Sequence, residues 1–154
     1  MQQSNGHKII VRNRKARHDY EITATLEAGI SLLGSEVKSL REGKVTIGDA
    51  YAEISNGEIL LKNLYISPYK MSADNNHDPL RVRRLLLHKR EIRKLKAKTE
   101  QKGMTLIPLS IYLKNRIFKV ELSIAIGRKM YDKRQVIAKA DADRKMQKAI
   151  KKDY

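Results

Sequence analysis

The sequence predicts a mainly β fold, a small antiparallel barrel with short flanking helices and a basic C-terminal tail. Several segments alternate apolar and polar residues, which is typical of half-buried strands. Turn-forming residues join these segments into hairpins, and other short stretches have helical periodicity. Closure into a barrel is expected because it removes exposed strand edges, although periodicity does not distinguish a closed barrel from a half-open sandwich.

The first predicted elements are a strand and a helix. Residues 20–26 alternate in polarity and Gly29 follows them, as expected for a strand and the break after it. A stripe at helical spacing comes next, formed by Leu33, Val37 and Leu40. Ser35 is suited to cap the first turn of this helix and Gly43 to end it. We expect the helix to pack on the sheet.

A tight hairpin and a loop come next. Residues 50–54 and 58–66 have strand-like patterns and are joined through Asn56-Gly57, a dipeptide that supplies the positive φ angles of a two-residue turn. Residues 67–79 are polar and contain two prolines, which favours an exposed loop over a central strand.

An amphipathic helix and a long hairpin complete the predicted body. The helix covers 88–101, and Gly103 follows its end. Its packed face is formed by Ile92, Leu95 and Thr99. The hairpin joins 104–113 to 117–126 around Lys114-Asn115-Arg116. Its inward side chains are expected to be Leu106, Tyr112, Phe118, Val120, Leu122, Ile124 and Ile126.

Positive charge is concentrated in three segments. The 154 residues include 33 Lys and Arg and 17 Asp and Glu, a formal net charge of +16 at pH 7. Residues 8–17, 81–98 and 127–154 have net charges of +5, +8 and +6, so the remainder of the chain is net −3. Basic runs also occur on ordinary solvated helix faces. Three of them around a slightly acidic remainder favour an anionic partner, and nucleic acid is the first candidate.

Several other classes of protein lack support in the sequence. Without cysteine there is no disulfide, thiolate zinc site or cysteine nucleophile, and the four histidines lack metal-ligand spacing. Neither a phosphate-binding loop nor a serine nucleophile elbow is present. Apolar runs are too short to span a bilayer, and no signal peptide is visible. We therefore expect no catalytic residue, metal, cofactor or membrane partner, and a cytoplasmic location.

Seven segments of this sequence resemble the small protein B (SmpB) family, which binds transfer-messenger RNA, also called SsrA. They are NRKARHDY (13–20), EAG (27–29), GSEVKSLR (34–41), ISPY (66–69), NHDP (76–79), RLLLHK (84–89) and GRKMYDKR (127–134). They occur in the family's order over most of the chain. The resemblance implies an antiparallel oligonucleotide-binding-like barrel with flanking helices, so the family sharpens the barrel prediction that periodicity left open.

The resemblance and the charge pattern together divide the chain into three parts. These are an N-terminal extension at 1–12, an RNA-binding β-barrel domain at 13–126 and a basic tail at 127–154. The apolar stripe of the tail is formed by Ala142, Met146, Ala149 and Ile150. Because so thin a stripe buries little surface, we expect a tail that is disordered in the free protein and helical when docked on the ribosome.

The function implied by the resemblance is trans-translation in bacteria. The protein would bind the tRNA-like domain of transfer-messenger RNA and mimic its missing anticodon arm. With elongation factor Tu, bound through the RNA complex, it would deliver this RNA to stalled ribosomes. Its tail would probe the empty mRNA channel beside the small-subunit decoding centre, which allows tagging of the nascent chain and ribosome rescue. The 28 residues from Gly127 would reach roughly 42 Å as a helix.

The resemblance assigns RNA contacts to Glu27, Leu86 and Lys119. Glu27 would accept hydrogen bonds from bases or ribose, Leu86 would offer apolar surface to an unstacked base, and Lys119 would pair with phosphate. Arg84 and Lys89, which flank the leucine run, complete the predicted RNA-binding set. The alternatives are that Glu27 and Lys119 are simply solvated and that Leu86 lies in the core. Without the resemblance, the run of three leucines favours the core position for Leu86.

The resemblance also assigns residues to the ribosome. His18 would face the decoding centre, where its ring can stack on a base, and the alternative is a solvated histidine. In the tail the matching residues are Gly127, Lys129, Asp132, Lys133 and Arg134. Arg128 stands where the family pattern has Lys.

Two other functions remain open at this point. A structural ribosomal RNA-binding protein would also be small, basic and tailed, and composition does not exclude it. A metal-free ribonuclease that uses His18 or His88 is the third hypothesis. Sequencing of the RNA that co-purifies with the protein separates the first two, because an adaptor enriches one transfer-messenger RNA over bulk ribosomal RNA.

Overall fold

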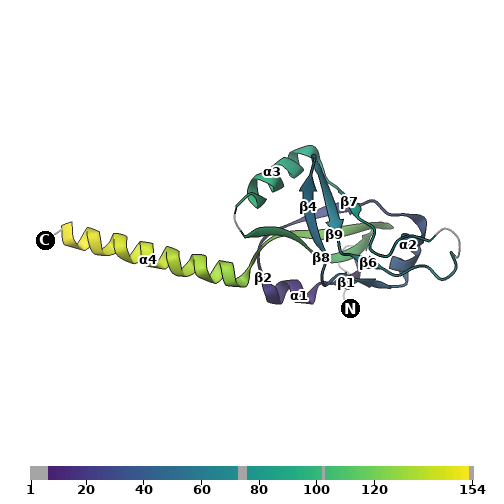
Figure 1. Ribbon diagram of the computed structural model, residues 1–154, viewed down its shortest axis with the longest axis horizontal. Helices are drawn as coiled ribbons and strands as arrows, with labels where there is room; N and C mark the ends of the chain where they lie inside the picture. Colours follow the sequence, from purple (N-terminus) through teal and green to yellow (C-terminus); the bar gives the residue numbers. More distant parts are fainter. Residues whose placement is uncertain (1–6, 73–75, 102, 153–154) are drawn as a thin grey trace.

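The computed structural model describes residues 7–72, 76–101 and 103–152 (Figure 1). The helices are α1 (Arg14–Asp19), α2 (Gly34–Arg41), α3 (Lys89–Thr99) and α4 (Arg128–Lys152). The strands are β1 (His7–Arg12), β2 (Tyr20–Ile30), β3 (Val45–Thr46), β4 (Tyr51–Ser55), β5 (Glu58–Lys62), β6 (Tyr65–Ile66), β7 (Arg83–Leu86), β8 (Met104–Lys114) and β9 (Ile117–Gly127).

Seven strands form one antiparallel sheet in the order β1-β8-β4-β5-β7-β2-β9. Strand β9 also pairs with β8, so the six strands from β8 to β9 in this order make a nearly closed ring. Strand β1 lies outside the ring and pairs with β8. Strands β3 and β6 form a separate pair. The prediction of a mainly β chain fits the body alone, since the 25 residues of α4 make the whole chain mixed α/β.

Both predicted hairpins are confirmed, and their turns explain why, but the predicted strand at 58–66 is divided: β5 ends at Lys62, Asn63 has a φ of 59°, and β6 pairs with β3 instead. Asn56 and Gly57 have φ angles of 50° and 76°, and Asn115 and Arg116 have φ angles of 49° and 66°. Positive φ at both central residues lets a two-residue turn follow the right-handed twist of the strands. In the second hairpin Lys114 still pairs with Ile117, so the turn is one residue shorter than predicted.

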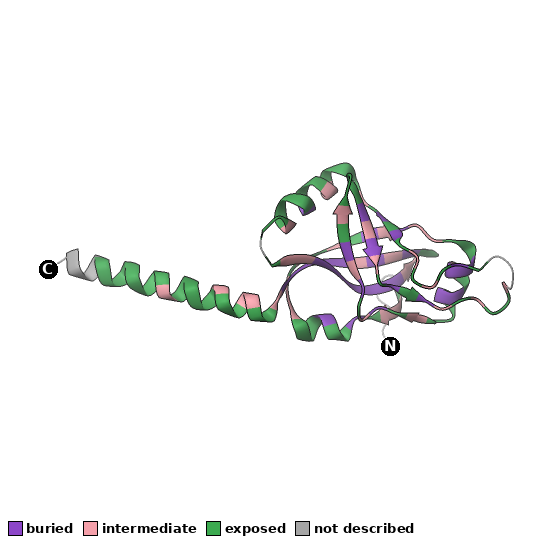
Figure 2. Ribbon diagram, in the orientation of Figure 1, coloured by how far each residue is buried: buried purple, intermediate pink, exposed green. Residues whose placement is uncertain are grey.

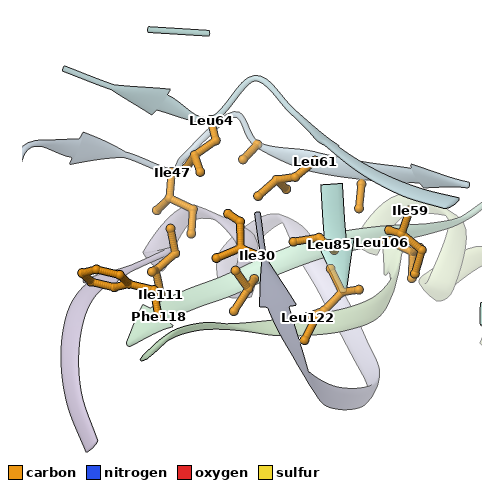
Figure 3. Close-up of a cluster of buried hydrophobic side chains, with 14 of the residues drawn as sticks. Ile30, Ile47, Ile59, Leu61, Leu64, Leu85, Leu106, Ile111, Phe118 and Leu122 are labelled. Atoms are coloured by element: carbon orange, nitrogen blue, oxygen red, sulfur yellow. The ribbon is translucent and has the colours of Figure 1, made fainter. Parts of the chain in front are cut away.

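The core lies inside the ring, where side chains from β5, β7, β8 and β9 point toward one another (Figure 3). The seven side chains predicted to point inward from the long hairpin are all buried, but Tyr112 lies on the outer face of the sheet, because a register shift between Pro108 and Ser110 reverses the alternation along β8. On α3, Leu95 is 4% exposed, and Ile92 and Thr99 are half-buried, so the predicted packed face is also confirmed.

The predicted inward face of residues 20–26 is divided by a β-bulge between Ile22 and Ala24. Before the bulge, Tyr20 and Ile22 pack on a small second cluster that contains Ala16. After it, Ala24 and Leu26 pack on the main core. The extra residue re-aims the side chains, so one strand serves two apolar clusters.

The start of α2 differs from the prediction that Ser35 is its N-cap. Leu33 occupies that position, and the Glu36 carboxylate accepts a hydrogen bond from the Leu33 amide at 2.7 Å. The Ser35 hydroxyl instead lies 2.8 Å from Nδ1 of His77. A tertiary partner therefore takes the hydroxyl that would otherwise cap the helix. Gly43, with a φ of 72°, follows the helix as expected.

The segment predicted as an exposed loop at 67–79 is anchored in the body by His77, which is 6% exposed. His77 Nε2 donates to the Ile66 carbonyl at 2.9 Å. Beside it, Glu36 is paired with Arg81 and with the fully buried Arg83. Burial alone disfavours the charged carboxylate, but hydrogen bonds from Arg81, the Leu33 amide and Arg83 outweigh this and lower the pKa of Glu36.

Two N-terminal elements have no counterpart in the predicted pattern. Residues 7–12, grouped above with an N-terminal extension, form β1 and pair with β8, while residues 1–6 lie outside the described part of the chain. Helix α1 follows, capped by Asn13, whose Oδ1 accepts a hydrogen bond from the Ala16 amide at 3.0 Å. The buried Asn13 amide also donates to the Pro108 carbonyl at 2.9 Å, which ties α1 to β8.

Helix α4 projects away from the body, and most of its residues are exposed (Figures 1 and 2). The tail is thus a helix in this structure, and its predicted disorder in the free protein stays a prediction. Within the described ranges, no helix is both long and apolar enough to cross a membrane.

Candidate nucleic-acid interface

An open groove crosses the outside of the sheet where β2, β7 and β9 meet the start of α3. Its lining residues are Glu27, Gly29, Leu86, Leu87, His88, Glu91 and Lys119. Three of the residues predicted to contact RNA, Glu27, Leu86 and Lys119, are therefore brought together from three separate strands.

The strand register explains this meeting. Gly29 on β2 is the cross-strand partner of both Leu86 on β7 and Lys119 on β9. Glu27 precedes Gly29 by two residues and therefore lies on the same face of β2. A Cβ atom at Gly29 would lie only 3.1 Å from the Cβ atom of Leu86. The absence of a side chain at Gly29 lets Leu86 lie across the strand and form the floor of the groove.

Leu86 faces solvent, and the interpretation of the leucine run as wholly buried is wrong. Leu86 is 48% exposed, whereas Leu85 is 2% exposed. Strand β7 alternates, with Arg83 and Leu85 directed inward and Arg84 and Leu86 outward. Arg83 can occupy an inward position because Glu36 pairs with it. Because Arg83 points inward to this ion pair, Leu86, three residues later on β7, points outward to solvent.

Glu27 is held as an ionised acceptor at the edge of the groove. It accepts a hydrogen bond from the Tyr112 hydroxyl, and Lys114 Nζ lies 3.4 Å from its Oε2. The bond from Tyr112, together with the charges of Lys114 and Lys119, lowers the pKa of Glu27 below its ordinary value. His7 stacks on the Tyr112 ring at a centroid distance of 5.1 Å.

Tyr112 and Lys114 are site residues that the sequence did not identify. The prediction that Tyr112 points inward is wrong: the residue is 8% exposed, but it pairs with Lys119 and bonds to Glu27 on the outer face, whereas its neighbour Ile111 lies in the main core. Burial and the bond to Glu27 raise the pKa of the phenol, so Tyr112 stays a neutral donor. No sequence signal links Tyr112 to Glu27, which precedes it by 85 positions.

Arg84 and Lys89 lie beside the groove but do not line it. Arg84 is exposed on β7 and its Nη1 is 3.2 Å from Oε1 of Glu58. Lys89 is the exposed first residue of α3. Helix α3 presents further exposed cations, namely Arg90, Arg93, Lys94, Lys96 and Lys98. The groove is thus bordered by a strongly cationic helix, and most of the α3 ribbon is coloured as exposed in Figure 2.

The residues predicted to face the ribosome gather at another place, where α1 ends and α4 begins. The His18 side chain is 89% exposed, with Nδ1 2.9 Å from the Asp19 carboxylate. Gly127 ends β9 opposite Tyr20, the residue that follows α1. Lys129, Asp132 and Lys133 are exposed on the first turns of α4. Arg134 is half-buried, with Nη1 4.0 Å from Sδ of Met104.

The histidines do not assemble a metal centre in the part of the chain that the structure describes, where no group of three or more His, Asp or Glu residues could hold a metal ion. His77 is used inside the body, His88 lies in the groove, and His18 is at the end of α1. His18 and His88, the two histidines of the ribonuclease hypothesis, thus lie in different regions of the molecule.

The groove, the cationic helix beside it and the projecting basic helix define a small nucleic-acid-binding protein with an extended arm. Phosphate attracts the cations, and an exposed leucine next to an ionised acceptor suits an unpaired base. The family model described as SmpB protein matches residues 10–152. The chain therefore belongs to the SmpB family.

Relatives and a solved structure agree with this assignment. The chain is 57% identical to the SsrA-binding protein of Halothermothrix orenii over 144 residues, 94% of this chain and 93% of the relative. It is also 57% identical to the SsrA-binding protein of Alkaliphilus oremlandii over 148 residues, 96% of each chain.

A chain in the solved structure described as "tmRNA-SmpB: a journey to the center of the bacterial ribosome" is also similar. The two chains superpose with a TM-score of 0.65 and are 55% identical, and the match covers 76% of this chain and 82% of that one.

Proposed function

We propose that this protein binds SsrA, the transfer-messenger RNA, and acts in trans-translation on stalled bacterial ribosomes. The observation that carries the proposal is the groove that gathers Glu27, Leu86 and Lys119 in a chain of the SmpB family. The relatives described as SsrA-binding proteins support the same RNA as the ligand here. The protein acts by binding and positioning RNA, without catalysis.

The groove contributes three kinds of contact to a folded RNA. The pKa of Glu27 is lowered, so its carboxylate accepts hydrogen bonds from exocyclic amines or ribose hydroxyls at neutral pH. Leu86, exposed at 48%, offers apolar surface on which an unstacked base can rest. Lys119, together with Arg84 and Lys89, neutralises phosphates along the rim of the groove.

The ligand we assign to the groove is the tRNA-like domain, whose missing anticodon arm the body replaces in shape and charge. In this proposal the nearly closed ring of strands is an oligonucleotide-binding-like barrel and residues 13–126 are the RNA-binding domain. A single-stranded or looped region suits the groove better than a regular helix, because unstacked bases expose the edges that Glu27 can recognise.

The extended arm, helix α4, is the part of the protein that we expect to contact the ribosome. Helix α4 has 25 residues, which span roughly 37 Å at about 1.5 Å per residue. That length and its exposed cations suit the empty mRNA channel, with His18 directed at the small-subunit decoding centre. Elongation factor Tu joins through the RNA complex in this scheme, and the cytoplasm is the compartment where all these partners meet.

RNA sequencing after purification of the tagged protein from bacterial cells tests the proposal against a structural ribosomal protein. Enrichment of transfer-messenger RNA over bulk ribosomal RNA supports the adaptor function. Equal recovery of all ribosomal RNAs, with no such enrichment, contradicts it. Binding to the isolated tRNA-like domain should weaken with salt, with a logarithmic slope of about −0.7 to −0.9 for each phosphate contacted.

Truncation after Lys129 tests the division between body and arm. Because the groove lies on β2, β7 and β9, the shortened protein should keep its affinity for transfer-messenger RNA, measured by filter binding. It should lose peptide tagging in a reconstituted translation reaction, since only two residues of α4 remain. A matching loss of RNA affinity would show that the arm belongs to the RNA-binding surface.

A further inference from the structure

Helix α3 carries cations for which the body supplies no counter-charge. Its eleven residues include six Lys and Arg and a single acid, Glu91. All six cations are exposed, and none of them forms an ion pair with a residue that the structure describes. Elsewhere on the body, Lys15, Lys62 and Lys114 each have a carboxylate oxygen within 3.4 Å. The charge of α3 is therefore not balanced within the protein.

Helix formation alone does not explain this composition. Arg90, Lys94 and Lys98 follow one another at intervals of four residues, and like charges at that spacing repel each other on a helix. The helix dipole favours cations only in the last turn, where Lys96 and Lys98 lie, and it disfavours Arg90 near the start. An anionic partner that lies along the helix would remove this repulsion.

The cations lie beside a seam between α3 and β2. At one end of the seam is the groove, whose lining includes Glu27 of β2 and Glu91 of α3. At the other end is a second hollow, whose lining includes Thr23 of β2 and Lys98 of α3. The same two elements therefore border both hollows.

Lys94 occupies the stretch of α3 between the two hollows. Glu91, Lys94 and Lys98 are spaced by three and four residues, so they share one side of the helix. From Glu91 to Lys98 the helix advances about 10 Å, which is more than the advance between neighbouring phosphates of one strand. The Glu91 carboxylate itself accepts a hydrogen bond from the His88 amide at 3.2 Å, at the positive end of the helix dipole. Lys94 and Lys98 are thus the cations that this side of α3 presents beyond the groove.

We propose that the seam between α3 and β2 is a track for an RNA backbone, in which Lys94 and Lys98 bind phosphates of the strand that leaves the groove. The inference rests on the proposed function, because the occupant is the same RNA whose unstacked base lies on Leu86. Continuity with the groove favours this occupant over a separate partner. Once the groove is filled, contact of the same strand with α3 is an intramolecular step with a high effective concentration.

The salt dependence of binding measures how many phosphates the track contacts. A variant with both Lys94→Gln and Lys98→Gln should have a slope of log affinity against log salt that is about 1.6 smaller in magnitude, or roughly 0.8 for each phosphate. If the variant and the wild type bind alike at 1 M salt, this corresponds to roughly 40-fold weaker binding at 0.1 M. Filter binding of the isolated tRNA-like domain across a salt series gives both quantities.

Two control variants separate a local contact from an effect of net charge. Lys94→Arg with Lys98→Arg keeps both charges and should keep the slope of the wild type. Lys44→Gln with Lys70→Gln removes the same charge from exposed positions, after α2 and after β6, and should also leave the slope unchanged. An unchanged slope in the glutamine variant of α3 overturns the proposal, and so does an equal change in the variant of Lys44 and Lys70.

The path of the RNA can be mapped directly, because the chain has no cysteine that competes with an introduced one. An iron chelate attached at Glu100→Cys, the exposed C-cap residue of α3, should cleave the bound tRNA-like domain through hydroxyl radicals. The same chelate at Lys70→Cys, in the loop after β6, should not. Absence of cleavage from position 100, or equal cleavage from both positions, contradicts the track.

Peptide tagging in a reconstituted translation reaction distinguishes this RNA from ribosomal RNA as the occupant. We expect the glutamine variant of α3 to tag weakly at low concentration and to recover at concentrations that saturate the RNA. If it keeps the affinity and slope of the wild type but loses tagging, the cations serve the ribosome and the proposal is wrong. Failure of the wild type to bind the tRNA-like domain would instead count against the proposed function.

Discussion

Replacement of Glu36 by Gln should destabilise the body strongly, because it leaves a buried arginine without its counter-charge. The side chains of Glu36 and Arg83 are both 0% exposed, so water cannot replace the lost partner. Arg83 also donates to the Leu64 carbonyl at 2.7 Å, which keeps its guanidinium in place after the substitution. The charge would therefore stay buried and unpaired.

The size of the effect follows from this geometry. Loss of one partner of a buried ion pair costs about 3–5 kcal/mol. The Leu33 amide and Arg81 also lose a charged acceptor, but Arg81 is 30% exposed and water can compensate it in part. We expect a loss near the lower limit, about 3 kcal/mol, which is a large fraction of the roughly 5–15 kcal/mol that stabilises a typical domain.

Urea unfolding followed by tyrosine fluorescence measures this loss, since the chain has seven tyrosines and no tryptophan. With a slope of about 2 kcal/mol per molar urea, the midpoint should fall by roughly 1.5 M. Glu42→Gln is the matched control, because Glu42 follows the same helix and its ion pair with Lys44 is exposed. That control should change stability by less than about 1 kcal/mol. Equal midpoints for the two variants would refute the reasoning.

Further predictions concern the core, the groove and pH. Leu85→Ala should cost about 2–5 kcal/mol of stability in urea unfolding, because Leu85 is 2% exposed. Leu86→Ala should leave the urea midpoint nearly unchanged and weaken RNA binding in filter assays, and the opposite pattern would reverse our assignment of the two faces. Glu27→Ala and Lys119→Ala should each weaken binding of the tRNA-like domain, and Lys119→Ala should also reduce the salt dependence by about one phosphate contact. The lowered pKa of Glu36 means that the folded state binds fewer protons there than the unfolded state. Its stabilisation should be complete above the ordinary pKa of 4.5 and lost as pH falls through the lower folded pKa, and Glu36→Gln should lack this part of the acid profile.

The groove depends on contacts that reach well beyond its own lining. The buried pair of Glu36 and Arg83 sets which face of β7 turns outward, and Gly29 leaves the space that Leu86 occupies. Tyr112 then holds Glu27 in its ionised form. Substitutions at Glu36, Gly29 or Tyr112 should therefore affect RNA binding even though Glu36 and Tyr112 are mostly buried.

Local chemistry made several features predictable from the sequence alone. The Asn56-Gly57 turn, the packed face of α3 and the inward side chains of the long hairpin other than Tyr112 all follow from rules that act over a few residues. The three basic segments and the seven family motifs can likewise be read directly along the chain. These signals were sufficient for both hairpins, for the anionic class of partner and for the family.

Only the tertiary structure decided which of these residues meet. The alternation along β7 fixes two faces but not which one turns inward, and that choice depends on Glu36, 47 positions before Arg83. Ser35 was expected to cap α2 but binds His77, 42 positions away. The bond from Tyr112 to Glu27 and the contacts of Arg128 with α1 span still longer separations. Local periodicity carries no information about such pairs, because the strand register and the closure of the ring bring them together.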